Sequence, residues 1–413
     1  MKLFPSHDNY GTANKLGQGL VTLILTSSLC LSVNAGPREQ AKRMHERLAV
    51  TPPSDSVLAT MEADIAGGNP LAAAYRAIET DGFYSVNLKN WVTPWTNEEQ
   101  TVFSPLNDYS ATVIGIIRDE YDFRQILTGD IIYVGDNNLG LPSYSNSNNN
   151  HYEALEDQRI SLRTGLVEAQ QSQVTGLPSD ATAGVVTTRA AAKSFFIAGT
   201  NRAMFRFTLM NHLCTDLEPL MDSTRAPDRI RQDVSRSPGG DSRIFLNNCI
   251  ACHSGMDPLS QAYAYYSYDY NADNDPTGVN GQIVYNAEGQ LDPITGSRVT
   301  YKHQINGDSF PTGFIIEDDQ WDNYWRQGIN ANLGWDQSLP GTGNGARSMG
   351  AELANSDAFA SCQVEKVFKQ VCLREPVDGT DRAQVDAMTT QFRSSGYNLK
   401  EIFAESAVYC MGE

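Results

Sequence analysis

Apolar residues recur at helical spacing through much of this chain. Before about residue 127, four such segments follow one another, and prolines and glycines separate them. We expect helices over residues 38–50, 54–66, 70–80 and 110–127, and again within 187–214. The pattern therefore predicts a mainly α protein with a multi-helix N-terminal region.

Two segments depart from this pattern. Asp130–Val134 is a short apolar run that predicts an extended piece. Residues 144–157 are rich in Asn and Ser, which favours turns in contact with solvent. We expect His151 in that segment to be an exposed loop residue and not a ligand.

The C-terminal end predicts a small unit of three helices. Ser356 can cap the first, which ends before Pro376. Thr380 can open a second that stops near Gly396. Asn398, with a glutamate three residues later, forms the capping pattern of a third.

The first 35 residues have the pattern of a secretory signal peptide. Lys2 and Lys15 precede an apolar run over residues 20–31, and small residues end at Ala35. A run of about 12 apolar residues is too short for a membrane anchor, which needs about 20. We expect cleavage after Ala35, export to the periplasm or beyond to the cell surface, and no membrane span in the mature chain.

The charge of the chain is strongly negative. The formal net charge is −18, and removing Lys2, Lys15 and Asp8 with the leader makes it −19. Because nucleic-acid binding depends on Lys and Arg contacts to phosphates, nucleic acid is excluded as an expected partner.

Chemistry enters at the stretch Asn247–Leu259, "NNCIACHSGMDPL". Cys249, Cys252 and His253 form C-x-x-C-H, the attachment pattern of c-type haem. Each thiol adds to a vinyl group of the porphyrin, and the histidine is then held at the iron. A zinc site would need a second pair of ligands, and none is nearby. The pattern therefore predicts one covalently bound haem c with His253 as the proximal ligand.

A longer pattern around the pentad resembles a known group of proteins. Asp257 and Pro258 extend the motif to C-x-x-C-H-x-x-x-D-P, which is similar to the haem-attachment domain of exported bacterial cytochrome-like proteins of mostly uncharacterised function. Residues 353–376 and 381–409 resemble the helical C-terminal domain that follows in that group. The chain departs from the group at Ser260, where glycine is usual, and at Ala264, where glutamate is usual. The resemblance implies an exported monohaem cytochrome-type protein.

The sequence does not identify the sixth ligand of the iron. Met256 lies too close to His253 to reach the distal side. Met349, in the Gly-rich stretch "LPGTGNGARSMG", is the favoured sulfur ligand, because we expect an irregular loop there. The alternatives are an open position or one of a further set of side chains: Met388, Met210, His212 and His303.

Two features near the motif have competing interpretations. Tyrosines 263, 265, 266, 268 and 270 either wall a haem pocket or pack a general core. The alternating oxygens of Asp269, Asn271, Asp273 and Asp275 resemble a calcium loop, but Asn274 and Asn280 occupy its glycine and glutamate positions. An ordinary acidic turn is therefore the favoured interpretation.

Four further cysteines remain in the mature chain, and an oxidising compartment would pair them. Cys362 and Cys372 would lie about 15 Å apart on one helix, which excludes a bridge between them. In an up-down-up trio the ends of the first and third helices meet. This favours Cys372 with Cys410 and leaves Cys214 with Cys362.

We therefore expect a signal peptide (1–35), a helical N-terminal domain (36–200), a haem-attachment domain with long irregular loops (201–345) and a C-terminal helical domain (346–413). The favoured function is electron transfer with a redox partner protein. The rival is a peroxidase-like oxidoreductase with an open distal site, which would need an acid–base group such as His212, His303 or Arg243.

Overall fold

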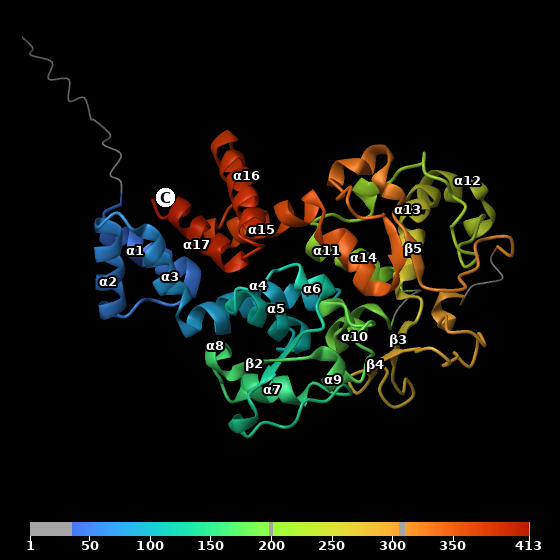
Figure 1. Ribbon diagram of the computed structural model, residues 1–413, viewed down its shortest axis with the longest axis horizontal. Helices are drawn as coiled ribbons and strands as arrows, with labels where there is room; N and C mark the ends of the chain where they lie inside the picture. The colour runs from blue at the N-terminus through green and yellow to red at the C-terminus, as the bar shows by residue number, and fades with distance from the viewer. Residues whose placement is uncertain (1–34, 198–200, 305–309, 413) are drawn as a thin grey trace, which may run out of the picture. The chain divides into compact units, whose positions relative to one another are not determined.

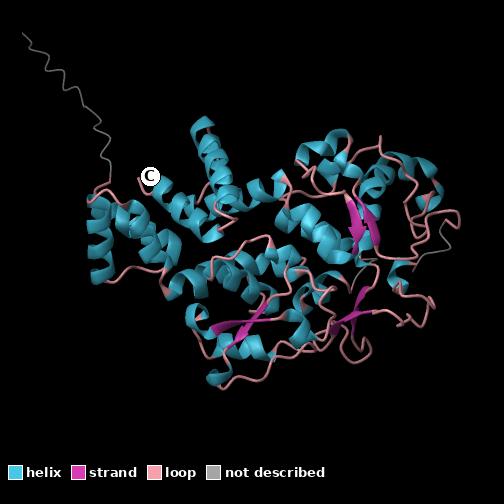
Figure 2. Cartoon of the chain, viewed as in Figure 1, coloured by secondary structure: helices cyan, strands magenta, loops and turns pink. Residues whose placement is uncertain are grey.

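The computed structural model describes residues 35–197, 201–304 and 310–412, and this part of the chain is mainly helical (Figure 2). The predicted leader, apart from Ala35, lies outside the described residues. Contacts group Ala35–Glu413 as one compact unit. Among the described helices, none is both long enough and apolar enough to cross a membrane.

Helices make up most of the described chain, and three small sheets join them (Figure 1). The α-helices are α1 (Pro37–Ala49), α2 (Asp55–Ala66), α3 (Pro70–Ile78), α4 (Lys89–Val92), α5 (Asp108–Arg118), α6 (Gln125–Thr128), α7 (Asn150–Asp157), α8 (Leu162–Gly165), α9 (Gln171–Thr175), α10 (Arg189–Phe195), α11 (Arg202–His212), α12 (Ser242–Ile244), α13 (Ile250–Ser260), α14 (Gly345–Ala354), α15 (Asp357–Cys372), α16 (Gly379–Ser394) and α17 (Leu399–Cys410). The sheets are antiparallel pairs: β1 (Ile132–Gly135) with β2 (Leu166–Ala169), β3 (Tyr266–Asp269) with β4 (Gln282–Tyr285), and β5 (Gln320–Asp322) with β6 (Thr342–Asn344). β1 confirms the extended piece expected near Asp130–Val134.

Local capping explains where the N-terminal helices begin and end. α1 starts with Pro37 in its first turn and ends at Val50, which is left-handed with φ 57°. The Asn107 and Ser110 side chains each accept from the other's backbone N–H, which is a reciprocal cap at the start of α5. The expected helix over 110–127 is divided into α5 and α6, because Glu120 adopts a φ of 58° between them.

The three expected C-terminal helices are present as α15, α16 and α17. The Ser356 hydroxyl caps α15 by accepting from Phe359 N at 3.1 Å, and Asn398 caps α17. The cap of α16 is Asp378, not the expected Thr380, because the Asp378 carboxylate accepts the first free N–H groups of that helix.

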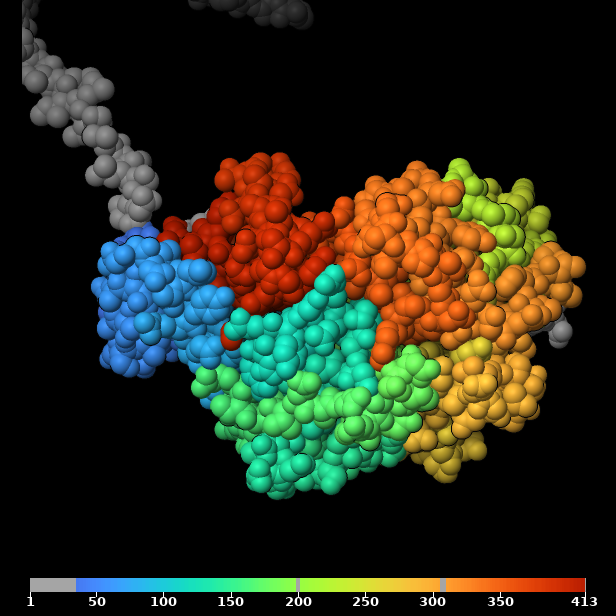
Figure 3. All heavy atoms as spheres, viewed as in Figure 1, coloured from blue at the N-terminus to red at the C-terminus, as the bar shows by residue number. Residues whose placement is uncertain are grey.

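The C-terminal helices pack on the N-terminal ones. α17 contacts both α1 and α3, and α15 contacts α1. In Figure 3 the C-terminal atoms, in red, lie directly against the N-terminal helices, in blue. One large hydrophobic core includes buried residues from both ends, among them Met44, Ala77, Phe403 and Ala407. Contacts therefore cross the boundaries between the expected domains.

The expected exposed loop over 144–157 is wrong in its second half, which forms α7. His151, Tyr152 and Leu155 are buried, and only 5% of His151 is exposed. The His151 Nε2 accepts from Gly135 N at 2.8 Å, and its Nδ1 lies 2.7 Å from the carbonyl oxygen of Pro142. The interpretation of His151 as an exposed residue is therefore wrong. Its side chain lies on α7 and accepts a hydrogen bond from Gly135, the last residue of β1.

The expected irregular loop around Met349 is also wrong, because a helix begins at Gly345. Ala346, Met349, Gly350 and Leu353 form a buried stripe at helical spacing along α14. A Cβ added at Gly350 would lie 2.0 Å from the carbonyl oxygen of Leu127, so glycine allows α14 to approach α6 closely.

Both expected disulfides are confirmed. Cys214 pairs with Cys362 across a Cα distance of 5.3 Å, and Cys372 pairs with Cys410 across 5.5 Å. The first bridge joins the end of α11 to α15, and the second joins the end of α15 to the end of α17. The C-terminal helices are thus covalently connected to the segment that precedes the motif.

Candidate functional site

The motif lies where a short π-helix, Phe245–Cys249, continues into α13. Cys249 and Cys252 are the free cysteines of the described chain, and both are partly exposed. Burial, followed by the neighbouring Cys249, raises the pKa of the Cys252 thiol. A reactive dithiol has the opposite shift. The Cys252 thiol is therefore accessible but is not activated in the manner of a thiol redox enzyme.

His253 is oriented by a buried carboxylate one helical turn away. Its Nδ1 lies 3.0 Å from Oδ1 of Asp257, whose side chain is fully buried, while the His253 side chain is 20% exposed. Because a carboxylate can only accept, Nδ1 carries the proton and donates it. The lone pair of Nε2 is then left available, which is the tautomer that an iron ligand requires.

Asp257 belongs to a buried cluster of charges that we call the arginine–aspartate cluster: Arg202, Arg231, Asp233 and Asp257. Arg202 donates to Asp257 through Nε at 2.7 Å and Nη2 at 3.1 Å, and its Nη1 and Nη2 donate to Asp233 at 2.9 and 2.8 Å. Arg231 donates to Asp233 from Nη2 at 3.0 Å and to Asp257 from its backbone N at 3.2 Å. Two positive and two negative charges thus neutralise one another around the partner of His253.

The cluster keeps its carboxylates ionised. Burial alone would raise the pKa of Asp257, but Arg202 and His253 outweigh it and hold that pKa well below its usual range. Burial likewise opposes ionisation of Asp233, and Arg231 and Arg202 lower its pKa. Asp257 is therefore a charged acceptor for the proton on His253 Nδ1.

Apolar side chains remain exposed on the segments that flank or contact the motif. We call them the apolar rim: Met221, Ile244, Leu246 and Ile329, which are 41–60% exposed. Ile244 and Leu246 immediately precede the motif in sequence. Met221 lies beside it, because the N–H of Asp222 donates to the carbonyl oxygen of Ala251 at 3.3 Å. Such surface gains free energy when an apolar group, such as the face of a porphyrin, covers it.

Three of the sequence candidates for the distal ligand, Met349, Met388 and His212, are buried. The Met349 and His212 side chains are both 0% exposed, and Met349 belongs to the main hydrophobic core. The Met388 side chain is 2% exposed, and its sulfur accepts a hydrogen bond from Ser406 Oγ. The His212 Nε2 lies 2.9 Å from the hydroxyl of Tyr109. Met210 is half-buried on α11. Met221, which the sequence analysis did not consider, is 43% exposed, and it directly precedes Asp222, whose N–H donates to Ala251 within the motif.

His303, another distal candidate, lies behind the motif in the arginine–aspartate cluster. Its Nδ1 accepts from Arg231 Nη1 at 2.8 Å, and its Nε2 lies 3.0 Å from Asn201 Nδ2. Arg243, the acid–base candidate of the enzyme interpretation, is 81% exposed and pairs with Asp241. His303 therefore has a structural role, and Arg243 points to solvent.

The tyrosines after the motif pack in the core. Tyr263, Tyr265, Tyr266 and Tyr268 are buried, and Tyr270 is partly so. The Tyr266 and Tyr268 hydroxyls donate to the carbonyl oxygens of Ala181 and Gly278. These contacts support the core-packing interpretation of the segment.

The acidic turn that follows uses its oxygens on its own backbone. Asp275 accepts from Val279 N at 3.0 Å and from Asn280 N at 2.6 Å, and these bonds lower its pKa. The Asn271 side chain accepts from two N–H groups of the same turn. Within the described ranges, no group of three or more His, Cys, Asp or Glu side chains is arranged to hold a metal ion.

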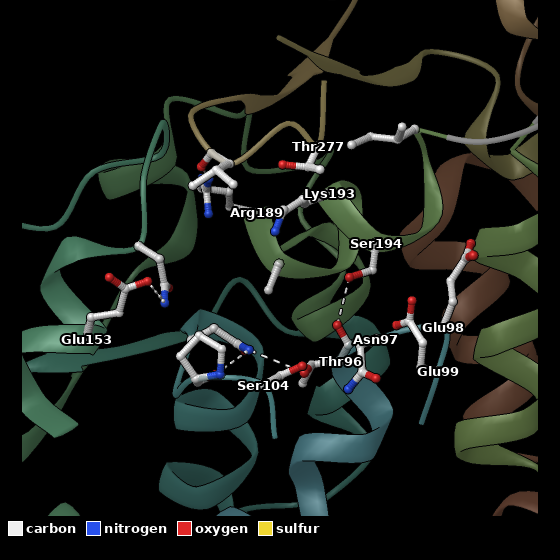
Figure 4. Close-up of a pocket in the computed structure, with 16 residues that line it drawn as sticks. Thr96, Asn97, Glu98, Glu99, Ser104, Glu153, Arg189, Lys193, Ser194 and Thr277 are labelled. Carbon is white, nitrogen blue, oxygen red and sulfur yellow. Dashed lines mark hydrogen bonds between the residues drawn. The ribbon is translucent and has the colours of Figure 1, made fainter. Parts of the chain in front are cut away.

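A cavity of about 440 Å³ lies elsewhere, between α10 and the segments 96–107 and 149–153 (Figure 4). Arg189 and Lys193, one turn apart on α10, extend into it. Burial and Arg189 lower the pKa of Lys193. Glutamates 98, 99 and 153 also line this cavity, so it carries both signs of charge. None of the motif residues lines it, so this cavity is separate from the motif.

Burial of His212 should make the free energy of unfolding depend on pH. Burial, followed by Lys366, lowers the pKa of His212 well below 6.5. The unfolded chain binds a proton at His212 near pH 6.5 and the folded chain does not, so this contribution is present above that pH and is lost as the pH falls. Between pH 7.5 and 5.5 the loss from His212 should be about 1.4 kcal/mol.

Urea unfolding of the wild type and of His212→Gln at both pH values measures this contribution. The variant should lose less stability on acidification, and the two proteins should behave in parallel above pH 7.5. An equal loss in both proteins on acidification would contradict the assignment.

Comparisons of the chain with models of protein families, with curated proteins and with solved structures find no match.

Proposed function

We propose that this chain is an exported c-type cytochrome that transfers electrons, with one haem held by thioether bonds from Cys249 and Cys252 and ligated by His253. The hydrogen bond from His253 Nδ1 to the buried carboxylate of Asp257 carries the proposal, because it presents Nε2 in the form that binds iron. The bound haem would supply a one-electron iron couple.

The chain's own residues have three tasks in this function. The two free thiols anchor the group, and the turn of α13 between them places His253 beside it. Asp257 fixes the orientation and tautomer of the imidazole. The apolar rim supplies the surface against which the macrocycle packs. No nucleophile or general base is needed.

The remaining features support export and a protein partner. Two disulfides are typical of an oxidising compartment, which agrees with the predicted leader and a periplasmic or cell-surface location. The charge of −19 that remains without the leader would steer a redox partner that presents a positive surface. Mass spectrometry of protein made in a host that matures c-type cytochromes tests the proposal, which fails if no tetrapyrrole is attached.

The peroxidase-like alternative loses its proposed acid–base groups. His212 and His303 are fully buried with ring nitrogens engaged by other residues, and Arg243 is paired at the surface. The electron-transfer function does not require such a group, and it is the one that we retain.

The distal ligand can be identified by comparing two methionine variants. Met349 binds iron only if α14 leaves the core, whereas Met221 is 43% exposed beside the motif. We expect Met221→Ala to abolish the weak sulfur-to-iron absorption band of the oxidised protein. Met349→Ala should keep the band and lower the free energy of unfolding by about 2–5 kcal/mol, as core truncations do.

Loss of the band in a folded Met349→Ala protein would instead assign the ligand to Met349. A wild-type protein without the band that readily binds cyanide or carbon monoxide would have an open distal position, and would favour the peroxidase-like alternative.

A further inference from the structure

The partner of His253 is held more firmly than an orienting role requires. Asp257 accepts from both Nε and Nη2 of Arg202 and from the backbone N of Arg231, and its side chain is fully buried. Arg202 and Arg231 are in turn bridged by Asp233. The carboxylate thus cannot turn away from the imidazole without breaking several charge-assisted hydrogen bonds.

We infer that Asp257 is a positioning residue that holds the reduction potential of the proposed haem low, by polarising His253 through the Nδ1–H hydrogen bond. This inference rests on the proposed function, and it adds to it the direction in which this chain tunes the couple.

The physical reason is the charge of the acceptor. A carboxylate draws the Nδ1 proton more strongly than a neutral carbonyl oxygen does, and this leaves more electron density on Nε2. A ligand with more electron density favours the oxidised, more positive iron. Reduction adds one electron from the partner protein, and the proton stays on Nδ1 of His253 in both states.

Among the four members of the arginine–aspartate cluster, the charges are balanced. Arg202 and Arg231 offset Asp233 and Asp257, so these four side chains together contribute little long-range potential. The electrostatic effect that remains at His253 is the attraction between its Nδ1 proton and Oδ1 of Asp257, which lies 3.0 Å from Nδ1. In the described chain Asp233 accepts from Arg202 and Arg231 and has no hydrogen bond to His253, although it lies in the same cluster.

Asp257→Asn and Asp233→Asn form a matched pair that tests the inference. Each removes one negative charge from the same buried cluster without changing the size of the side chain, but only the first changes the acceptor of His253. Spectroelectrochemical titration of the haem-loaded proteins gives the midpoint potentials. In Asp257→Asn the ratio of oxidised to reduced protein at a fixed potential should fall by at least about tenfold, which is about 59 mV for one electron.

The change in Asp233→Asn should be smaller, less than about threefold, because only the screened long-range charge is altered. Equal shifts in the two variants, or no shift in Asp257→Asn, overturn the inference. Covalent haem is weighed in the same samples by mass spectrometry. Protein without haem therefore refutes the proposed function, whereas haem-loaded protein with unshifted potential refutes only this inference.

The wild type provides a second readout if Asp257→Asn does not fold. The iron–histidine stretching frequency of its reduced, five-coordinate form, reached by photolysis of the carbon monoxide complex, reports the strength of the bond from Nε2. A frequency in the range of haem proteins whose proximal histidine donates to a carboxylate supports the inference. A frequency in the range of those whose histidine donates to a backbone carbonyl overturns it.

Discussion

Replacing Cys249 and Cys252 together by serine should abolish covalent attachment of haem to this protein. Serine keeps the size of the side chain but cannot form the thioether bonds that the motif predicts. After denaturation and acid extraction, the wild type should retain haem absorbance on the polypeptide, and the double variant should retain none. Intact-protein mass spectrometry should show the same difference.

Ile250→Ala is the matched control, because Ile250 lies between the two cysteines and is half-buried but supplies no bond to the porphyrin. It should keep the covalent group. The single Cys249→Ser and Cys252→Ser variants should each keep at most one thioether. Haem that remains bound after denaturation in the double variant would show that other residues attach it, and the proposed site would be wrong.

Removing the Cys214–Cys362 disulfide should lower the free energy of unfolding by about 5 kcal/mol in the double alanine variant. The bridge spans 148 residues, and constraint of the unfolded chain grows with the length of the closed loop. The Cys372–Cys410 bridge spans 38 residues, and its removal should cost about 4 kcal/mol. Urea unfolding followed by circular dichroism measures both losses.

The single variant Cys214→Ala separates the bridge from side-chain packing. Cys214 is exposed, so its truncation removes little buried surface, yet it breaks the disulfide as completely as the double change does. We expect nearly the full loss from this one substitution. A loss of less than about 1 kcal/mol would mean that the bridge contributes little, and that the entropic account does not apply here.

Features that depend on neighbouring residues could be predicted from the sequence. The helix caps at Ser356 and Asn398 need only a side chain and an N–H group three residues later. The pairing of Cys372 with Cys410 followed from the rise of one helix and the order of three. The C-x-x-C-H spacing is equally local, because Cys249 directly precedes α13 and Cys252 and His253 lie in its first turn.

Predictions that depended on burial were less successful. His151 was expected in solvent and Met349 in an irregular loop, yet both lie on buried helical faces. In each case the content of Asn, Ser or Gly suggested a loop, and a stripe of buried residues at helical spacing outweighed it. The amino-acid composition of a segment reflects its local conformational preference, whereas packing against distant elements decides whether a helix forms.

The sequence by itself determined the C-x-x-C-H spacing, the helical character of the chain and the order of its C-terminal helices, because bond lengths, helical rise and capping act over a few residues. Only the tertiary structure decided what surrounds His253. Asp257 lies one helical turn from His253, so the sequence alone could suggest it as the partner of the imidazole. Arg202, in contrast, is 55 residues from Asp257 and 31 residues from Asp233 in the sequence. Arg202 reaches Asp257 because α11 packs against α13, and Asp233 comes from the segment between these helices; contacts at such separations have no periodic trace in the sequence.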